Sequence, residues 1–241
     1  MNAIYETEKL VSEYLLFHYG RSEDILPWEE GPTEALGFPA RIVERFSDRE
    51  VERSLDLGCA VGRSSFELSR TSREVIGIDY SQAFVDAAIG MKEAGRARIS
   101  RLEEASLESR LDVRLPDGVR PERVSFEQGD AMELREDLGG FDRVLAANLL
   151  CRLREPAKLL ARLPDLVKPG GELVLTTPCT WLEEFTPPGN WPAEGTFAWL
   201  QSELAGDFEL VAEHDEPFLI RETARKFQWT VAMLTRWKRA T

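Results

Sequence analysis

Histidine and cysteine are scarce in this chain of 241 residues, which contains two histidines and three cysteines. His18 and His214 are too few for a histidine-built metal site, so we expect no metal ion. Cys59, Cys151 and Cys179 are odd in number and irregularly spaced. This pattern argues against a disulfide framework and is typical of proteins in a reducing cytoplasm.

Positive charge and long apolar runs are lacking as well. The chain has 30 Lys and Arg against 43 Asp and Glu, a formal net charge of -13. An acidic surface repels phosphate, which disfavours nucleic acids and anionic membranes as partners and favours a small-molecule substrate. No apolar stretch approaches the roughly 18–20 residues of a membrane span, and the acidic, amphipathic N-terminus does not resemble a signal peptide. We therefore expect a cytoplasmic protein.

What the chain does contain is a repeated alternation of short apolar strands and amphipathic helices. The expected strands lie near 53–57, 74–78, 124–127, 141–148, 172–177, 208–214 and 227–237. The expected helices lie near 62–70, 81–95, 156–167 and 196–205. Charged residues 96–121 interrupt this alternation and predict a surface insertion or long connection. The order predicts an α/β fold: a Rossmann-like, mostly parallel seven-stranded sheet with an antiparallel last strand and helices on both faces.

The N-terminal part precedes this alternation. Apolar residues at roughly helical spacing over 4–19 predict an amphipathic helix, and the Pro- and Gly-rich segment 21–39 predicts a loop or lid. A second helix is expected near 40–47. We therefore expect one domain for the whole chain, in which a helical cap (1–50) covers a Rossmann-like core (51–241).

A glycine-bearing turn joins the first two strands of the core. It reads DLGCAVG over residues 56–62, and the second strand ends in Asp79. Glycines let the backbone approach a ligand closely, and an acid after the second strand can accept hydrogen bonds from ribose hydroxyls. The spacing differs from the Gly-x-Gly-x-x-Gly of dinucleotide sites. It resembles the first motif of class I S-adenosylmethionine (SAM) methyltransferases, Asp-x-Gly-x-(Gly)-x-Gly, with Ala60 at the middle glycine.

Suitable hydrogen-bonding groups also follow the next two strands, at the edge of the sheet where such folds bind ligands. Asp130 stands where methyltransferases place an acid for the adenine amino group, and Ala131 can donate its backbone N–H to the ring. Asn148 ends the fourth strand, where methyl donor and acceptor would meet. A lone Asp is also a common turn residue, but four suitable strand ends favour SAM. The expected SAM contacts are Tyr14, Asp56, Gly58, Ala60, Gly62, Asp79, Tyr80, Asp130, Ala131 and Asn148.

Further blocks outside this motif resemble one specific family. They read YET (5–7), YLLFHYG (14–20), DLGCAVGRSSFEL (56–68), ANLLCRL (147–153), TPCTWLEEF (177–185), PFLIRE (217–222) and RKFQWT (225–230). They resemble the C-terminal methyltransferase domain of the ovothiol biosynthesis enzyme. The resemblance implies SAM-dependent methylation of 4-mercaptohistidine (5-thiohistidine) on an imidazole nitrogen, the one nearer the amino acid side chain. Its products would be ovothiol and S-adenosyl-L-homocysteine (SAH).

One feature of that family is missing from this sequence. In the family, the methyltransferase domain commonly follows an iron-dependent sulfoxide synthase domain, which is built around a histidine cluster. The resemblance therefore implies that a separate synthase supplies the substrate, either to a standalone methyltransferase or to an excised domain.

The implied reaction requires orientation, because the protein must present a ring nitrogen to the methyl and keep the softer thiolate sulfur away. A protonated ring nitrogen must also lose its proton, so a base or a tautomer-fixing acceptor is expected. The catalytic candidates are Asn148, His18 and Tyr19. Tyr14 and His18 are four residues apart on one predicted helix and should share a face. Ordinary packing of that helix would account for the same residues.

Five residues are candidates for binding the substrate. Arg152, Arg221 and Arg225 can pair with a carboxylate or a thiolate, although a lone arginine is more often a solvated or salt-bridged surface residue. Trp181 can stack on an imidazole ring, and Gln228 can hydrogen-bond a ring nitrogen. Two other functions stay open: methylation of another small amino acid or imidazole metabolite, and SAM binding without catalysis by a partner protein.

Overall fold

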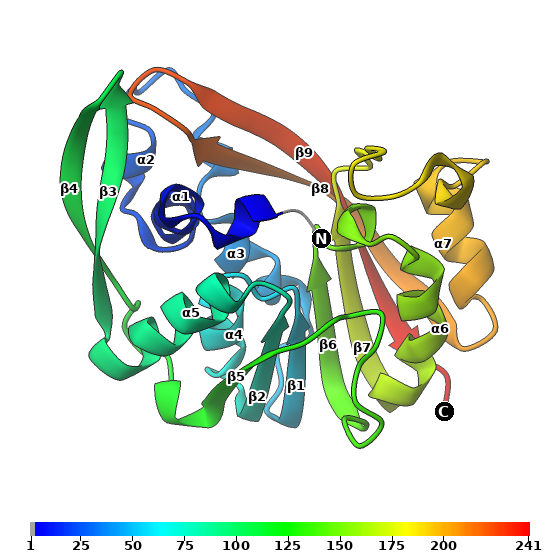
Figure 1. The fold of residues 1–241 in the computed structure, drawn as a ribbon. Coiled ribbons are helices and arrows are strands. Elements are labelled where there is room, and N and C mark those ends of the chain that lie inside the picture. Colours follow the sequence, from blue (N-terminus) through cyan, green and yellow to red (C-terminus); the bar gives the residue numbers. More distant parts are fainter. Residues whose placement is uncertain (1–2) are drawn as a thin grey trace.

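The computed structural model describes residues 3–241, and a seven-stranded sheet forms its centre (Figure 1). The strands are β1 (Val51–Leu57), β2 (Ser72–Asp79), β5 (Val124–Gln128), β6 (Phe141–Ala147), β7 (Val167–Thr177), β8 (Phe208–Arg221) and β9 (Phe227–Arg239). Their order is β5-β2-β1-β6-β7-β9-β8. The pairs from β5 to β7 are parallel, and β9 is antiparallel to both of its neighbours. The expected mostly parallel sheet with an antiparallel last strand is confirmed.

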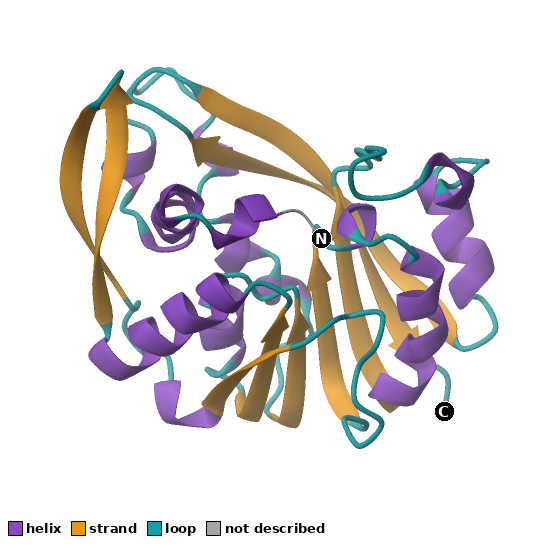
Figure 2. Cartoon of the chain, in the orientation of Figure 1, coloured by secondary structure: helices purple, strands orange, loops and turns teal. Residues whose placement is uncertain are grey.

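Helices cover both faces of this sheet (Figure 2). They are α4 (Arg63–Leu68), α5 (Gln82–Ala94), α6 (Pro156–Leu166) and α7 (Thr196–Leu204). Side chains of α4 and α5 join one hydrophobic cluster, whereas those of α6 and α7 join another. Neighbouring residues of one strand divide between the two clusters: Leu145 belongs to the first and Val144 to the second. Strand side chains alternate between faces, so burial on both sides requires the nearly continuous apolar runs seen in the sequence.

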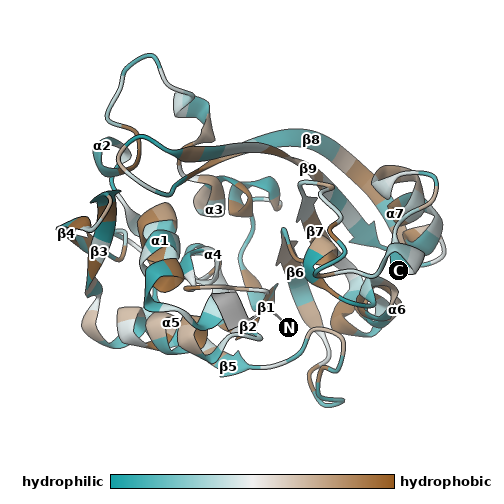
Figure 3. Ribbon diagram, turned by 45° about the horizontal axis from the view of Figure 1, so that its top comes forward, coloured by the Kyte–Doolittle hydropathy of each residue, from teal (hydrophilic) through white to brown (hydrophobic). Residues whose placement is uncertain are grey.

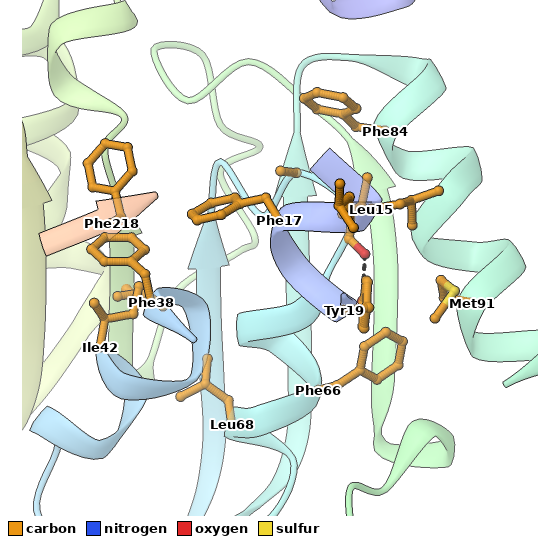
Figure 4. Packing of buried hydrophobic residues seen from close by; sticks show 14 of the residues in the cluster. Leu15, Phe17, Tyr19, Phe38, Ile42, Phe66, Leu68, Phe84, Met91 and Phe218 are labelled. Atoms are coloured by element: carbon orange, nitrogen blue, oxygen red, sulfur yellow. Dashed lines mark hydrogen bonds between the residues drawn. The ribbon is translucent and has the colours of Figure 1, made fainter. Parts of the chain in front are cut away.

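The N-terminal part forms a cap on the sheet. Its elements are η1 (Ala3–Glu6), α1 (Glu8–Tyr19), α2 (Ser22–Ile25), η2 (Thr33–Ala35), α3 (Phe38–Arg41) and η3 (Val43–Arg45). The expected first helix is divided at Thr7, whose hydroxyl caps α1 by accepting from the Leu10 amide at 3.3 Å. Figure 4 shows how α1 is fastened: Phe17 packs beside Phe38 and Phe218, with ring centroids 6.2 and 6.0 Å away.

Residues 96–121 differ from the expected surface connection. They contain β3 (Arg96–Glu104) and β4 (Leu107–Arg114), which pair as a separate antiparallel hairpin beside α1. Only one face of this hairpin is covered, where Ile99 and Val113 are buried against the cluster that includes α1. The expectation was wrong because a two-stranded hairpin with one covered face needs few apolar residues. The charged residues between them obscured the alternation that is typical of strands.

The last two strands are longer than expected, and their extra length matters for the site. β9 pairs with β7 only as far as Met233, while its earlier residues continue to pair with β8 beyond the end of the sheet. We call residues 216–232 the arm. The arm crosses over α1 toward the β3–β4 hairpin (Figures 1 and 3), where the Ala224 amide donates to the Glu103 carbonyl at 3.2 Å. The arm therefore covers the carboxyl ends of the parallel strands.

Candidate functional site

A cavity of about 520 Å³ lies between the carboxyl ends of the parallel strands, α1 and the arm. This volume falls within the roughly 300–1,000 Å³ of small-molecule pockets. The cavity has two sides. The strand-end side is formed by the turns after β1, β2, β5 and β6. The cap side is formed by α1 and the arm.

The turn after β1 forms one wall of the strand-end side. Gly58, Ala60 and Gly62 all have positive φ angles, of 71°, 47° and 87°. The Ala60 amide donates to Oδ2 of Asp79 at 2.8 Å, and this hydrogen bond links the turn to the end of β2. Gly58 and Ala60 line the cavity, but Gly62 does not. A Cβ at Gly62 would lie 2.6 Å from the Phe126 ring, so packing explains this glycine rather than the expected ligand contact.

Two carboxylates lie at the ends of β1 and β2, as expected, and both line the cavity. Asp56 accepts from the Ser65 hydroxyl at 2.6 Å, and burial raises the pKa of its carboxyl to about 7. Asp79 accepts from the amides of Ala60 and Ser81, at 2.8 and 2.9 Å, and burial raises its pKa to about 6. Neither carboxylate forms an ion pair with a Lys or Arg in the described part of the chain. A ligand that donates hydroxyl groups or carries positive charge would complement them.

The turn after β5 places its residues in two connected hollows. Ala131 lines the main cavity, as expected of a residue that contacts the ligand ring. Asp130 instead lines a smaller hollow, and its Oδ1 accepts from the Met132 amide at 2.8 Å. Tyr80 and Arg152 line both hollows, so the two adjoin. An adenine ring between Ala131 and Asp130 would bridge them.

Asn148 follows β6 and reaches the cavity in the left-handed conformation, with φ at 52°. Asparagine adopts this region more readily than most residues. Its Oδ1 accepts from the Thr176 hydroxyl at 2.9 Å, and its backbone N–H donates to the Thr176 carbonyl at 2.8 Å. The side-chain NH₂ is therefore the group left for a ligand, which makes Asn148 a hydrogen-bond donor in the cavity.

One face of α1 lines the cap side, with residues at a spacing of three or four. They are Leu10, Glu13, Tyr14, Phe17 and His18. The predicted shared face of Tyr14 and His18 is confirmed, because their ring centroids lie 6.0 Å apart. Tyr14 also packs against Phe84 at 4.7 Å. Burial raises the pKa of the Tyr14 hydroxyl, so the phenol stays protonated and can donate a hydrogen bond.

His18 carries an unsatisfied polar atom. The residue is only 9% exposed, and its Nδ1 has no hydrogen-bond partner among residues 3–241. Burial, together with the nearby Arg63 guanidinium, lowers the pKa of the imidazole to about 3. A neutral imidazole of such low basicity cannot store a proton at neutral pH. It can still exchange a hydrogen bond with a ligand, and buried polar atoms normally have such partners.

Two aromatic candidates lie outside the cavity lining. The Tyr19 hydroxyl donates to the Val61 carbonyl at 2.7 Å (Figure 4), within the packed cluster beneath α1. Trp181 donates from Nε1 to the Thr196 hydroxyl at 2.9 Å and packs against Trp199. The expectations that Tyr19 takes part in catalysis and that Trp181 stacks on the substrate are therefore corrected, because both side chains are used in packing.

Two arginine candidates also lie outside the lining. Arg221 is buried, and its guanidinium donates to the carbonyls of Asp24, Thr223 and Ala224, at 2.8, 3.0 and 3.2 Å. It fastens the turn at the end of the arm instead of facing a ligand. Arg225 lies exposed on that turn. Their expected role in binding the substrate is corrected for this reason.

Arg152 and Gln228, in contrast, do line the cavity. The Arg152 guanidinium donates to the Thr180 carbonyl at 3.3 Å and lies 4.7 Å from the centre of the Phe185 ring. Gln228 lies on the arm beside Thr230. Neither the Gln228 amide nor the Thr230 hydroxyl forms a hydrogen bond within the described residues.

The sequence did not identify the arm as a wall of the cavity. Phe218 and Ile220 of β8 line the cavity together with Glu222, which follows β8, and with Gln228 and Thr230 of β9. Their register pairs Phe218 with Thr230 and Ile220 with Gln228. The strand expected near 227–237 does not lie wholly within the sheet. Trp229 is 54% exposed, because the arm has left the sheet and its outer face meets solvent.

Comparison with known proteins places this fold in a family. Residues 32–215 match a family model described as a methyltransferase domain. The chain belongs to this family. Together with the sheet order, this match confirms the expected superfamily, the class I SAM-dependent methyltransferases.

Curated relatives of this methyltransferase have diverse names. A demethylmenaquinone methyltransferase of Clavibacter sepedonicus is 32% identical over 124 residues, which are 52% of this chain and 40% of that protein. A tRNA U34 carboxymethyltransferase of Idiomarina loihiensis is 26% identical over 170 residues, which are 66% of this chain and 46% of that protein. The chain thus spans less than half the length of these relatives.

Solved structures agree with the fold along nearly the whole methyltransferase. The N-methyltransferase NodS of Bradyrhizobium japonicum, in complex with SAH, superposes with a TM-score of 0.57 at 14% identity. That match covers 96% of this chain and 99% of the other. The cyclase SpnF gives a TM-score of 0.58 at 18% identity, covering 98% and 97%. At such identities the likeness establishes the fold alone.

Two further properties concern the described residues only. No helix within residues 3–241 has the length and apolar character needed to cross a bilayer. The same residues contain no group of three or more His, Cys, Asp or Glu side chains arranged to hold a metal ion.

Proposed function

We propose that this methyltransferase transfers the methyl group of SAM to an imidazole nitrogen of 4-mercaptohistidine. One observation carries the proposal: sequence blocks that resemble the ovothiol methyltransferase domain, although far apart in the chain, converge on one cavity. The block at 14–20 contributes Tyr14 and His18, and the block at 147–153 contributes Asn148 and Arg152. Blocks at 177–185, 217–222 and 225–230 supply further lining residues.

The strand-end side suits SAM. The Asp79 carboxylate can accept from the ribose hydroxyls, as Ala60 and Ser81 hold it in place with their amides. The Ala131 amide and the Asp130 carboxylate can bind the adenine ring, and Asp56 lies where the cationic part of SAM would pass. SAM supplies a methyl group on a sulfonium, and no metal is required for the transfer.

On the cap side, His18 can fix the tautomer of the acceptor ring. If a nitrogen of the His18 imidazole accepts the N–H of one ring nitrogen, the other nitrogen presents its lone pair to the methyl. The N–CH₃ bond then forms as the S–CH₃ bond breaks, and the resulting ring cation is balanced by the substrate thiolate. The acceptor must react in the form that has already lost one proton to solvent, with a thiolate and a neutral ring, because His18 takes up no proton. The low pKa of His18, about 3, therefore favours a tautomer-fixing acceptor over a general base.

The Asn148 amide can complete this arrangement. Its free NH₂ group can donate to the thiolate sulfur, which would hold the softer nucleophile away from the methyl. Arg152, which also lines the cavity, can pair with the carboxylate of the amino acid.

The test is incubation of the chain with SAM and 4-mercaptohistidine, followed by mass spectrometry for methyl product and NMR for its position. We expect a single N-methyl isomer, on the nitrogen nearer the side chain. Methylation of histidine or of another imidazole in preference to mercaptohistidine would contradict the substrate assignment. SAM binding without turnover on any imidazole thiol would favour a non-catalytic SAM-binding protein.

A further inference from the structure

Two carboxylates face the cap side of the cavity from different elements. Glu13 belongs to α1, and Glu222 directly follows β8 at the end of the arm; both line the cavity. They are close enough for the negative charge of Glu222 to raise the pKa of Glu13, in addition to the effect of burial. Glu13 and Glu222 belong to the cap side, whereas Asp56 and Asp79 lie at the strand ends. The pair is therefore a separate anionic region of the cavity.

The cations that accompany this pair are weakly held. Lys9 lies 3.7 Å from Glu13, and Lys226 lies 2.5 Å from Glu222. The two members of each pair are four residues apart in sequence. The two lysine side chains are 67% and 71% exposed, whereas the carboxylates are 16% and 30% exposed. Ion pairs of exposed lysines contribute little, because water screens them and the long side chains lose entropy. A cationic ligand group can displace them.

Unpaired polar groups beside these carboxylates also indicate a ligand. His18 lies on the same face of α1 and carries a buried Nδ1 without a partner among residues 3–241. Gln228 and Thr230 of the arm also line the cavity, and their side chains form no hydrogen bond within the described residues, although Gln228 is exposed to solvent. Glu13 and His18 are five residues apart, which is about 7–8 Å along a helix.

We propose that Glu13 and Glu222 bind the primary ammonium group of the methyl acceptor, while His18 holds its ring. The inference rests on the proposed function and deepens it, because it states which part of the amino acid is recognised and where. It also assigns a function to Arg221. This buried guanidinium is a positioning residue: by bonding the carbonyls of Asp24 and Thr223 it fixes the turn that presents Glu222.

The subsite predicts that the enzyme distinguishes an acceptor with an amino group from one without it. Two ligands that differ only in the ammonium group isolate its contribution to binding: 4-mercaptohistidine, and its des-amino analogue, mercaptoimidazolyl propionate. Their affinities are measured by calorimetry on the SAH-saturated chain, and their KM and kcat by methyl transfer from SAM. The variants are Glu13→Gln, Glu222→Gln and the double substitution, which remove charge while keeping shape.

We expect each single variant to weaken mercaptohistidine binding by about 10-fold and the double variant by about 100-fold, since hydrogen bonds to charged groups are strong. The des-amino analogue should bind weakly to the wild type and equally to all variants. Glu8→Gln is the matched control, because Glu8 lies exposed on α1 and outside the cavity. The SAH affinity and the Tm of each variant are measured as well. Unchanged values show that the strand-end side and the fold are intact.

The outcomes separate this subsite from the proposed function. Equal losses for both ligands, or no loss for either, overturn the ammonium subsite even if mercaptohistidine is methylated. Charge-dependent binding of the amino ligand without methyl transfer supports the subsite and overturns the proposed function. If the wild type binds neither ligand, both proposals are wrong.

Discussion

The two sides of the cavity are built in different ways. On the strand-end side, the polar groups are held by their own neighbours, as when the Asp79 carboxylate accepts the amides of Ala60 and Ser81. On the cap side, the Nδ1 of His18 and the amide of Gln228 have no partner within residues 3–241. The first side is therefore organised before a ligand arrives. The second offers groups that have no partner within the described residues and that a substrate can bind.

This difference suits a transferase with one fixed and one variable ligand. The fold is common to proteins with the names of N-methyltransferase and cyclase. A rigid strand-end side can keep one cofactor while the cap side changes, because α1 and the arm lie outside the parallel part of the sheet. Changes on the two sides should therefore have separable effects.

The largest effect is expected at the strand end. We predict that Asp79→Ala weakens SAM binding by about 100-fold or more, since the ribose hydroxyls lose a charged acceptor and the Ala60 amide loses its anchor. Titration calorimetry measures it. Asp86→Ala, an exposed position on α5, is the control and should bind SAM normally. Normal SAM affinity in a folded Asp79→Ala protein would show that the end of β2 does not hold the ribose.

Acid should weaken the same side by about 10-fold. Burial raises the pKa of Asp79 to about 6, so its carboxyl is mostly protonated at pH 5 and mostly ionised at pH 7.5. Only the ionised form accepts both hydroxyl groups, so SAM affinity should rise with pH through about 6 and level off above 7. Affinity that is flat from pH 5 to 8 would contradict this, and proton release on binding measured near pH 6 would support it.

A smaller effect should reveal which face of the arm the acceptor meets. Thr230 faces the cavity, whereas Trp229, its neighbour in sequence, is exposed on the outer face. We predict that Thr230→Val raises KM for the acceptor by about 3–10-fold, the usual effect of one lost neutral hydrogen bond. Trp229→Ser should leave KM and SAM affinity unchanged. The reverse result would mean that the arm presents its other face to the substrate.

The smallest effect concerns stability. The folded protein holds the pKa of Asp56 at about 7, above the roughly 3.9 of an unfolded Asp. The folded state then binds more protons between pH 4 and 7, so this group makes the fold less stable as pH rises through that window. Asp56→Asn should raise Tm without ligand by a few degrees at pH 8 and by much less at pH 4.5. Scanning calorimetry at both values checks this, and an equal change at both would point to altered packing instead.

Sequence patterns anticipated the strand-end side because its information is local. The turn over 56–62 and the acids after β1 and β2 lie within a few residues of the strands that position them. Gly62 shows the limit of this reasoning, because its requirement comes from Phe126, more than sixty residues away. Asp130 also reaches only the smaller hollow, since the direction of a turn cannot be inferred from its sequence.

The cap side was anticipated only in part. Helical spacing placed Tyr14 and His18 on one face, but the same spacing could not tell which face of α1 meets the cavity, so Tyr19 was misjudged. Arg221 was misjudged because an arginine that binds a ligand and one that binds carbonyls look alike in a sequence. Glu13 was missed because a single acid on an amphipathic helix usually meets solvent.

By itself, the sequence determined the parallel α/β sheet, the glycine turn and the carboxylates that suit SAM. Each of these depends on periodicity or spacing within one βα unit, where the backbone alone fixes the geometry. Only the tertiary structure decided that the arm leaves the sheet after Met233 and passes over α1. It thereby brought Glu222 to Glu13, across most of the chain, because packing of the cap against the hairpin and the arm sets that distance.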